Sequence, residues 1–245
     1  MFTLCGGHIM DIHDGCLDEG IRIVDVRHEQ VAAHAVGGYS RVTGTAGCAV
    51  VTAGPGTTDA STGVANAFQA ESPMLPIGGR GATDQHRMGS LQDLPQVDLL
   101  SPISKFSASV PANTRVADMV SMAFREAYLG APGPPYLGIP RDVLERRVSV
   151  EQAVVPEPGR YRASTRSQGD PQDVEGPAEL LANSSRPCIL LGQPVWTCRD
   201  GEVAAALLFS HGITGYPYST DVPVEVLGAE HRRARAIGNP PMAPA

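Results

Sequence analysis

Four short segments of this 245-residue chain carry residue types that can bind a ligand, and all are expected near the ends of apolar strands. They offer glycines that let a ligand approach the backbone, a carboxyl group, and histidine and glutamine side chains. Ligands of open α/β sheets bind beside the carboxyl ends of the strands, so we expect these segments at one sheet edge. The segments are Cys5-Gly6-Gly7-His8, Arg27-His28-Glu29-Gln30, Gly54-Pro55-Gly56 and Leu91-Gln92-Asp93.

Each segment also has an ordinary structural explanation when it is taken alone. A carboxylate such as Glu29 in the first turn of a helix is favoured by the helix dipole. Gly54-Pro55-Gly56 can be a turn that starts a helix, and Gln92 can be an exposed loop residue. The segment 54–56 is not part of a Gly-x-Gly-x-x-Gly motif, which argues against a dinucleotide-binding module.

Short apolar runs bounded by Gly or Pro predict strands that are covered on both faces. They span residues 21–26, 48–53, 74–78, 136–139 and 188–192, and Pro76 is expected to interrupt the third of them. Helical periodicity or composition predicts helices over 30–39, 57–70 and 116–129, with Thr57, Thr58 and Asp59 as candidate N-caps of the second. This alternation predicts an α/β fold with a parallel sheet and helices on both faces.

The composition changes along the chain and predicts two domains. Residues 1–148 are expected to form the first domain, and the Pro- and Gly-rich stretch 149–172 a linker. Residues 173–220 are expected to begin a second, incomplete α/β domain, with a helix over 171–182 and another over 201–209. The stretch 221–245 is expected to be an irregular or disordered tail.

Charge and cysteine usage exclude several classes of protein. The formal net charge is −7, which disfavours nucleic-acid binding. The apolar runs are too short for a membrane-spanning helix, and residues 1–5 do not resemble a secretory signal. The five cysteines form no Cys-x-x-Cys pair, which disfavours a disulfide framework and a zinc site. We therefore expect a cytoplasmic protein with reduced thiols.

The four segments together, with their neighbours, resemble the thiamine-diphosphate enzymes of the acetolactate synthase type. The likeness is carried by 27–41, by 51–60 followed by 63–67, by Ser72-Pro73-Met74, by Leu91-Gln92-Asp93, and by 131–135 ahead of 139–143. These motifs occur in the family's order and spacing over residues 1 to about 200. Acetolactate synthase, oxalyl-CoA decarboxylase and 2-hydroxyacyl-CoA lyase are the relatives that the chain resembles.

The resemblance implies thiamine diphosphate as cofactor and a role for each segment. Glu29 would share a proton with a ring nitrogen of the aminopyrimidine, which favours the tautomer that activates the thiazolium carbon. Thr52, Gly54, Pro55 and Gly56 would pack against the aminopyrimidine, and Gly6 and Gly7 would let the backbone approach the thiazolium. Gln92 would face the substrate. In the family, Mg²⁺ is held by a Gly-Asp-Gly…Asn segment of another domain, and the middle domain binds FAD or ADP.

Other features depart from the family pattern. Cys5 replaces a frequent Pro, and Asp59 replaces a frequent Asn. The family chain is more than twice as long, and no Gly-Asp-Gly occurs in this sequence. We therefore expect the cofactor-binding portion of a carboligase or decarboxylase that is inactive alone. It would form a homo-oligomer or pair with a diphosphate-binding domain through the helices expected at 30–39 and 57–70. The alternative is a non-catalytic remnant or interaction module.

Overall fold

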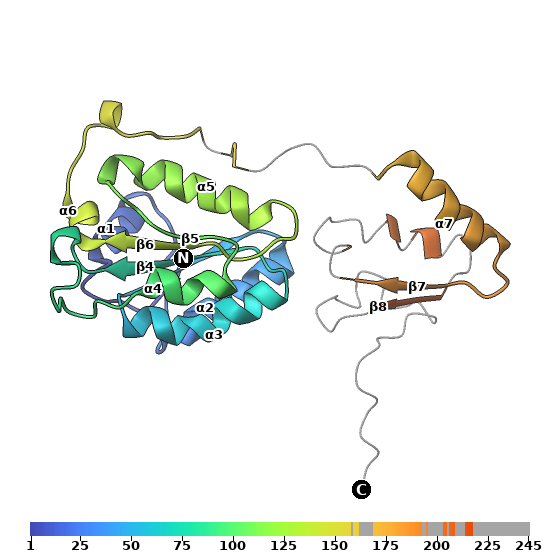
Figure 1. Cartoon of the computed structure of the whole chain (residues 1–245), viewed down its shortest axis with the longest axis horizontal. Coiled ribbons are helices and arrows are strands. Elements are labelled where there is room, and N and C mark those ends of the chain that lie inside the picture. The colour runs from blue at the N-terminus through green and yellow to red at the C-terminus, as the bar shows by residue number, and fades with distance from the viewer. Residues whose placement is uncertain are drawn as a thin grey trace, which may run out of the picture. The chain divides into compact units, whose positions relative to one another are not determined.

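The computed structural model describes residues 1–157, 159–161, 169–192, 195, 203–204 and 206–208, and the backbone of 214–217. The chain divides into two compact units, Met1–Arg162 and Ala163–Ala245 (Figure 1).

The first unit is built on a six-stranded sheet in which every pair of neighbouring strands is parallel. The strand order is β2-β1-β3-β4-β6-β5. The chain therefore reverses direction across the sheet between β1 and β3, a switch point at which open α/β sheets bind their ligands. The strands are β1 (Phe2–Thr3), β2 (Val24–Asp25), β3 (Gly47–Val51), β4 (Met74–Arg80), β5 (Ser107–Ser109) and β6 (Tyr136–Pro140).

Helices cover both faces of this sheet (Figure 1). One face carries α1 (Met10–Asp18), α5 (Val116–Tyr128) and α6 (Arg141–Glu145), and the other carries α2 (Glu29–Thr43), α3 (Pro55–Gln69) and α4 (Gln96–Leu100). Short 3₁₀ turns link them: η1 (Thr83–Gln85), η2 (Ser101–Ile103), η3 (Asn113–Arg115) and η4 (Val150–Gln152). The predicted parallel α/β fold with two helical layers is confirmed.

Alternate side chains of the central strands fill two separate cores. On β3, Ala49 and Val51 join the core under α2 and α3, whereas Val50 joins the core under α5. On β4, Met74 belongs to the first core and Leu75 to the second. Because both faces of these strands are buried, their sequences are continuously apolar, as parallel strands require.

Two predictions about the central elements are wrong. Helix α3 begins at Pro55, and its N-cap is Gly54 rather than Thr57, Thr58 or Asp59. Proline suits the first helical position because the amide hydrogen that it lacks would have no partner there. Strand β4 is also continuous through Pro76, which pairs with Ala49 in the middle of the sheet.

The bounds of other elements differ from those predicted, and several elements, among them α1 and β5, were not predicted at all. The strand expected over 21–26 is reduced to β2, and α2 continues through two glycines to Thr43, where Gly44 ends it in the left-handed conformation with φ 65°. Helix α1 and strand β5 had no counterpart among the predicted elements.

The segment after α6 contacts the first unit. Val154 N donates to Thr114 O at 3.1 Å. The Tyr161 ring lies 5.4 Å from Phe124 and 6.2 Å from Tyr128, both on α5. Residues up to 161 therefore belong to the first unit, although the sequence predicted that the linker begins at residue 149.

The second unit contains helix α7 (Pro171–Asn183) and a parallel pair, β7 (Cys188–Leu191) with β8 (Thr214–Pro217). Asp170 caps α7, because its side chain accepts from Gln172 N at 2.9 Å. Leu191 and Leu208 form a small core. Of the helix expected over 201–209, residues 203–204 and 206–208 are helical, and the tail expected over 221–245 lies outside the described residues. Within the described part of the chain, no helix has the length and apolarity to cross a membrane.

Candidate functional site

Glu29 lies at the carboxyl edge of the sheet, as the first residue of α2. His28 caps this helix, since its Nδ1 accepts a hydrogen bond from Gln30 N at 3.2 Å. The helix packs closely on α3, because a Cβ at Gly63 would lie only 2.5 Å from the Ala33 Cβ. The backbone that carries the Glu29 carboxyl group is therefore held on a rigid pair of helices.

The Glu29 side chain is buried without a polar partner. The residue is 9% exposed. Among the described residues it makes no hydrogen bond and no ion pair. The Glu29 oxygens are not among the described side-chain atoms that are both fully buried and without a partner, so they still reach the solvent. The carboxyl group can therefore accept a hydrogen bond from a ligand at this edge of the sheet.

Gly56 lies beside this carboxyl group, Thr52 lies beside Gly56, and Gly6 lies beside Thr52. A Cβ at Gly56 would lie 3.1 Å from Glu29 Oε1 and 2.7 Å from Thr52 Cγ2. A Cβ at Gly6 would lie 2.4 Å from Thr52 Cβ. The loops after β1 and β3 thus meet at the switch point, and only glycine fits at these two positions without a shift of Thr52.

The predicted turn at Gly54-Pro55-Gly56 is fixed from a distant loop. Gly54 has φ 56°, and a Cβ there would lie 2.5 Å from the Gln92 carbonyl oxygen. Gln92 itself has φ 59°, a left-handed conformation that is uncommon outside glycine. Pro55 is the exposed first residue of α3. The structure therefore brings Gln92 to the turn through its backbone.

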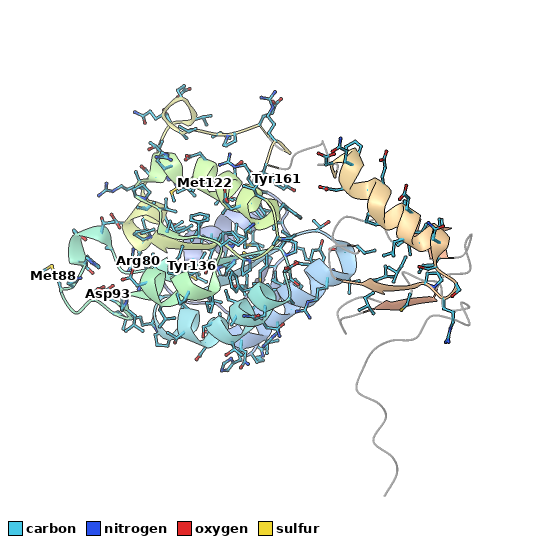
Figure 2. All side chains as sticks on the ribbon, turned by 45° about the vertical axis from the view of Figure 1, so that its right-hand side comes forward. Arg80, Met88, Asp93, Met122, Tyr136 and Tyr161 are labelled. Atoms are coloured by element: carbon cyan, nitrogen blue, oxygen red, sulfur yellow. The ribbon has the colours of Figure 1, made fainter. Side chains whose placement is uncertain are left out.

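A cleft of about 510 Å³ lies beside this cluster, at the same sheet edge. Two predicted residues, Gly7 and Gln92, line it, and a Cβ at Gly7 would meet nothing within 4 Å. The loop between η1 and α4, which carries Met88 and Asp93, lies at this end of the unit (Figure 2). The complete lining is Gly7, His8, Gly81, Ala82, Asp84, Gln85, Ser90, Leu91, Gln92, Arg141, Asp142 and Glu145.

Gln96 holds the turn at Gly54 through buried hydrogen bonds, and the sequence did not predict this role. The residue is 1% exposed, and its Oε1 accepts from Gly54 N at 2.9 Å. Its Nε2 donates to Gly79 O at 2.6 Å and to the Tyr136 hydroxyl at 2.8 Å. Burial raises the pKa of Tyr136 to about 12, although hydrogen bonds from Thr57 and Gln96 and the nearby Arg80 act in the opposite direction (Figure 2). Tyr136 therefore stays a neutral hydroxyl at neutral pH.

His28, Glu29 and Asp59 bring metal-binding atom types within 4.8 Å of one another. The His28 Nδ1 already accepts a backbone hydrogen bond, so a neutral ring carries its proton on Nε2. That Nε2 lies 3.8 Å from Asp59 Oδ2 and presents a proton to it rather than a lone pair to a metal. This chemistry favours an imidazole–carboxylate pair beside Glu29.

Comparison with known proteins agrees with this geometry. Residues 1–99, which contain every predicted site residue, match the model of the thiamine pyrophosphate enzyme N-terminal TPP binding domain. The acetolactate synthase large subunit of Mycobacterium tuberculosis is 36% identical over 212 residues, or 85% of this chain. The chain belongs to the thiamine pyrophosphate enzymes of the acetolactate synthase type. Thiamine pyrophosphate is another name for thiamine diphosphate.

Two further relatives include one that is named for a second reaction. The 2-hydroxyacyl-CoA lyase 2 of Danio rerio is 46% identical over 156 residues, 64% of this chain and 25% of that protein. The probable acetolactate synthase large subunit of Methanocaldococcus jannaschii is 33% identical over 196 residues, 78% of this chain and 33% of that protein. The chain spans 37% of the Mycobacterium tuberculosis protein. A model described as Ligase-CoA domain also matches residues 192–241, most of which lie outside the described residues.

Proposed function

We propose that this chain is the pyrimidine-binding part of a thiamine pyrophosphate enzyme that makes or breaks carbon–carbon bonds next to a carbonyl group. The observation that carries the proposal is Glu29, a residue that is 9% exposed and whose carboxyl group has no hydrogen bond among the described residues, beside Gly56 and Thr52. An aminopyrimidine ring is flat and carries hydrogen-bonding nitrogens that can pair with such a carboxyl group. When bound, thiamine pyrophosphate supplies a carbon that holds the electron pair of the broken bond.

Each residue of the cluster takes a role from this fit. Glu29 would hold a proton between its carboxyl group and a ring nitrogen, as an acid–base group does. Gly6, Thr52, Gly54, Pro55 and Gly56 would shape the wall against the ring, because a side chain at Gly6 or Gly56 would collide with Thr52. Gly7 and Gln92, which line the cleft, would face the substrate.

We propose decarboxylation of a 2-oxo acid with formation of a new carbon–carbon bond as the reaction of the whole enzyme. The relatives named acetolactate synthase support it, because they align over 78–85% of this chain. Cleavage of a 2-hydroxyacyl-CoA is the second candidate, and the 46% identity with the Danio rerio lyase favours it. Both reactions use a small-molecule substrate with an oxygen on the carbon where the bond changes.

The cofactor proposal also includes ions and groups held elsewhere in the family. Mg²⁺ would accompany the diphosphate through a Gly-Asp-Gly…Asn segment, which is not among these 245 residues. FAD or ADP would belong to the family's middle domain. We also propose a reducing, cytoplasmic setting, since the four cysteines within the described residues, Cys5, Cys16, Cys48 and Cys188, are free thiols.

We propose that the outer surfaces of α2 and α3 pair with a second copy or with a diphosphate-binding domain. On α2, Val31 is 51% exposed and Val42 is 78% exposed, and Ala35 and Gly38 lie between them at helical spacing. A contiguous apolar patch on a helix surface is typical of a contact surface. Sedimentation at increasing concentration should show association, and a monomer at every concentration would contradict it.

Calorimetric titration tests the cofactor proposal. The chain is titrated with thiamine pyrophosphate and Mg²⁺, alone and mixed with the full-length Mycobacterium tuberculosis relative. We expect binding heat from the mixture beyond that of the relative alone, and we expect Glu29→Ala to remove the excess. Glu19→Ala, an exposed acid after α1, is the matched control and should keep it. The absence of excess heat in every mixture would contradict the proposal and favour the alternative, a non-catalytic interaction module.

A further inference from the structure

His8 is a buried imidazole that the proposed cofactor chemistry does not use. It follows the Gly6-Gly7 pair after β1, is 7% exposed, and lines the cleft. Its Nδ1 lies 3.3 Å from Thr52 Oγ1, in the wall against which Glu29 is packed. A Cβ at Gly79 would lie 2.6 Å from the His8 Cβ, so β4 fixes the residue from the other side. The ring is therefore held between the cofactor wall and the cleft.

The surroundings of His8 keep its ring neutral. Burial lowers the pKa of His8, the positive charge of Arg141 lowers it further, and a backbone hydrogen bond at Leu91 acts in the opposite direction. The other charged groups that line the cleft are Asp84 of η1 and Asp142 and Glu145 of α6. Asp142 accepts hydrogen bonds from Thr83, and Glu145 pairs with Arg141, so both carboxylates are already engaged.

We propose that His8 is the acid–base group of the cleft, which exchanges a proton with the oxygen on the substrate carbon where the bond is made or broken. This inference rests on the proposed function. A neutral imidazole is the side chain best suited to accept such a proton near neutral pH. Within the described lining of the cleft, His8 is the one imidazole. The Asp142 and Glu145 carboxylates are bound to Thr83 and Arg141, and the third carboxylate, Asp84, is exposed, whereas His8 is buried.

The proton and electrons balance in both directions. On cleavage, the O–H bond of the substrate hydroxyl breaks, its proton goes to a ring nitrogen of His8, and its electron pair becomes the C=O π bond. The pair of the broken carbon–carbon bond goes to the fragment that the thiamine cofactor holds. On bond formation, His8 first takes a proton from the solvent in the cleft, and the carbonyl oxygen then takes the π pair and receives that proton from the imidazolium.

The test separates His8 from Glu29 in the holoenzyme, in which this chain is assembled with its diphosphate-binding partner, thiamine pyrophosphate and Mg²⁺. Hydrogen–deuterium exchange at the thiazolium carbon reports the role of Glu29, and turnover of pyruvate or of a 2-hydroxyacyl-CoA reports the carbon–carbon step. We expect His8→Ala to slow turnover by about 10²–10⁴-fold and to leave exchange within a few-fold of the parent. Added imidazole should restore part of the lost turnover.

Matched variants give each outcome one meaning. Glu29→Gln should slow both exchange and turnover, whereas Glu19→Ala, at an exposed acid after α1, should slow neither. Exchange that slows as much in His8→Ala as in Glu29→Gln would overturn the proposal and leave His8 as part of the cofactor wall. Unchanged turnover in a folded His8→Ala holoenzyme would overturn it as well. A parent enzyme without any exchange would instead contradict the proposed function.

Discussion

The wall around Glu29 and the cleft beside it are built by opposite means. The wall consists of backbone and small side chains, glycine at 6 and 56 and a threonine at 52, with one acid, Glu29, that is 9% exposed. The lining of the cleft includes long, charged side chains, and those of Arg141 and Glu145 are 57% and 47% exposed. The wall is rigid because close backbone contacts define it, whereas the surface of the cleft can change with each side chain.

This difference corresponds to the two ligands that we propose. A cofactor is the same molecule throughout a family, so its wall can be made from main-chain contacts that tolerate no added atom. Substrates differ between acetolactate synthases and 2-hydroxyacyl-CoA lyases, and loops tolerate substitution better than the elements that they connect. Gln92 belongs to both regions, because its backbone contacts Gly54 and the residue lines the cleft.

The largest expected effect comes from removing the one acid of the wall. Glu29→Gln keeps the size of the side chain but cannot share a proton in the same way. We expect exchange at the thiazolium carbon in the assembled enzyme to slow by ~10²-fold or more, with little change in thermal unfolding. Glu145→Gln in the cleft is the control and should leave exchange unaltered. Equal exchange rates in the parent and Glu29→Gln would reduce Glu29 to an acid that stabilises the start of α2.

The second test removes the support beneath the wall. Gln96→Leu would leave Gly54 N–H, Gly79 C=O and the Tyr136 hydroxyl without their partner in a buried place. Unsatisfied buried groups are costly, so we expect the free energy of unfolding to fall by about 3 kcal/mol in urea titrations. Gln69→Leu on the exposed surface of α3 should change it little. Equal losses in the two variants would show that Gln96 does not hold the turn.

The neighbouring glycines at 6 and 7 allow the wall and the cleft to be compared within a single loop, because Gly6 contacts Thr52 and Gly7 lines the cleft. A methyl group at position 6 would collide with Thr52, whereas one at position 7 would meet nothing within 4 Å. We expect Gly6→Ala to lower the free energy of unfolding by about 2 kcal/mol and to weaken thiamine pyrophosphate binding. Gly7→Ala should leave both nearly unchanged. We would compare the two variants by calorimetric titration and by urea unfolding. Similar losses of stability and binding in both variants would contradict the difference between wall and cleft.

The sequence predicted the sheet well where the signal was local. The continuously apolar stretches around β3 and β4 indicated strands buried on both faces, and such strands were found. Helix α1 was missed because Met10–Asp18 contains a glycine and several acids and buries only Cys16. Strand β5 is three residues of Ser107–Ser109, without apolar alternation. Both elements owe their conformation to the layers against which they pack.

Some residues of the site could also be predicted from a local motif, and others could not. Glu29 and the turn at 54–56 stand in compact motifs, so the sequence alone could suggest them. Gln96 and His8 do not, because their partners are 42 and 44 residues away along the chain, at Gly54 and Thr52. The role of a buried glutamine or histidine can be inferred only when the fold shows which partners it contacts. The polarity of Gln96 within an otherwise apolar helix, Gln96–Leu100, was the one local sign.

The smallest expected effect concerns the engaged carboxylate of the cleft. Burial alone would raise the pKa of Asp142, but the hydrogen bonds from Thr83 Oγ1 at 2.6 Å and Thr83 N at 2.8 Å, with Arg146, outweigh it and lower the pKa. A carboxyl group whose pKa is lower in the folded than in the unfolded state stabilises the fold above its unfolded value, near 4. That stability disappears as the pH falls through the folded value.

We expect the parent to lose about 1 kcal/mol more than Asp142→Asn between pH 7 and pH 3 in urea unfolding. The contact between Gly6 and Thr52 should not share this dependence, since neither residue titrates. If Asp142→Asn loses as much stability on acidification as the parent, the acid sensitivity of the unit arises outside the cleft.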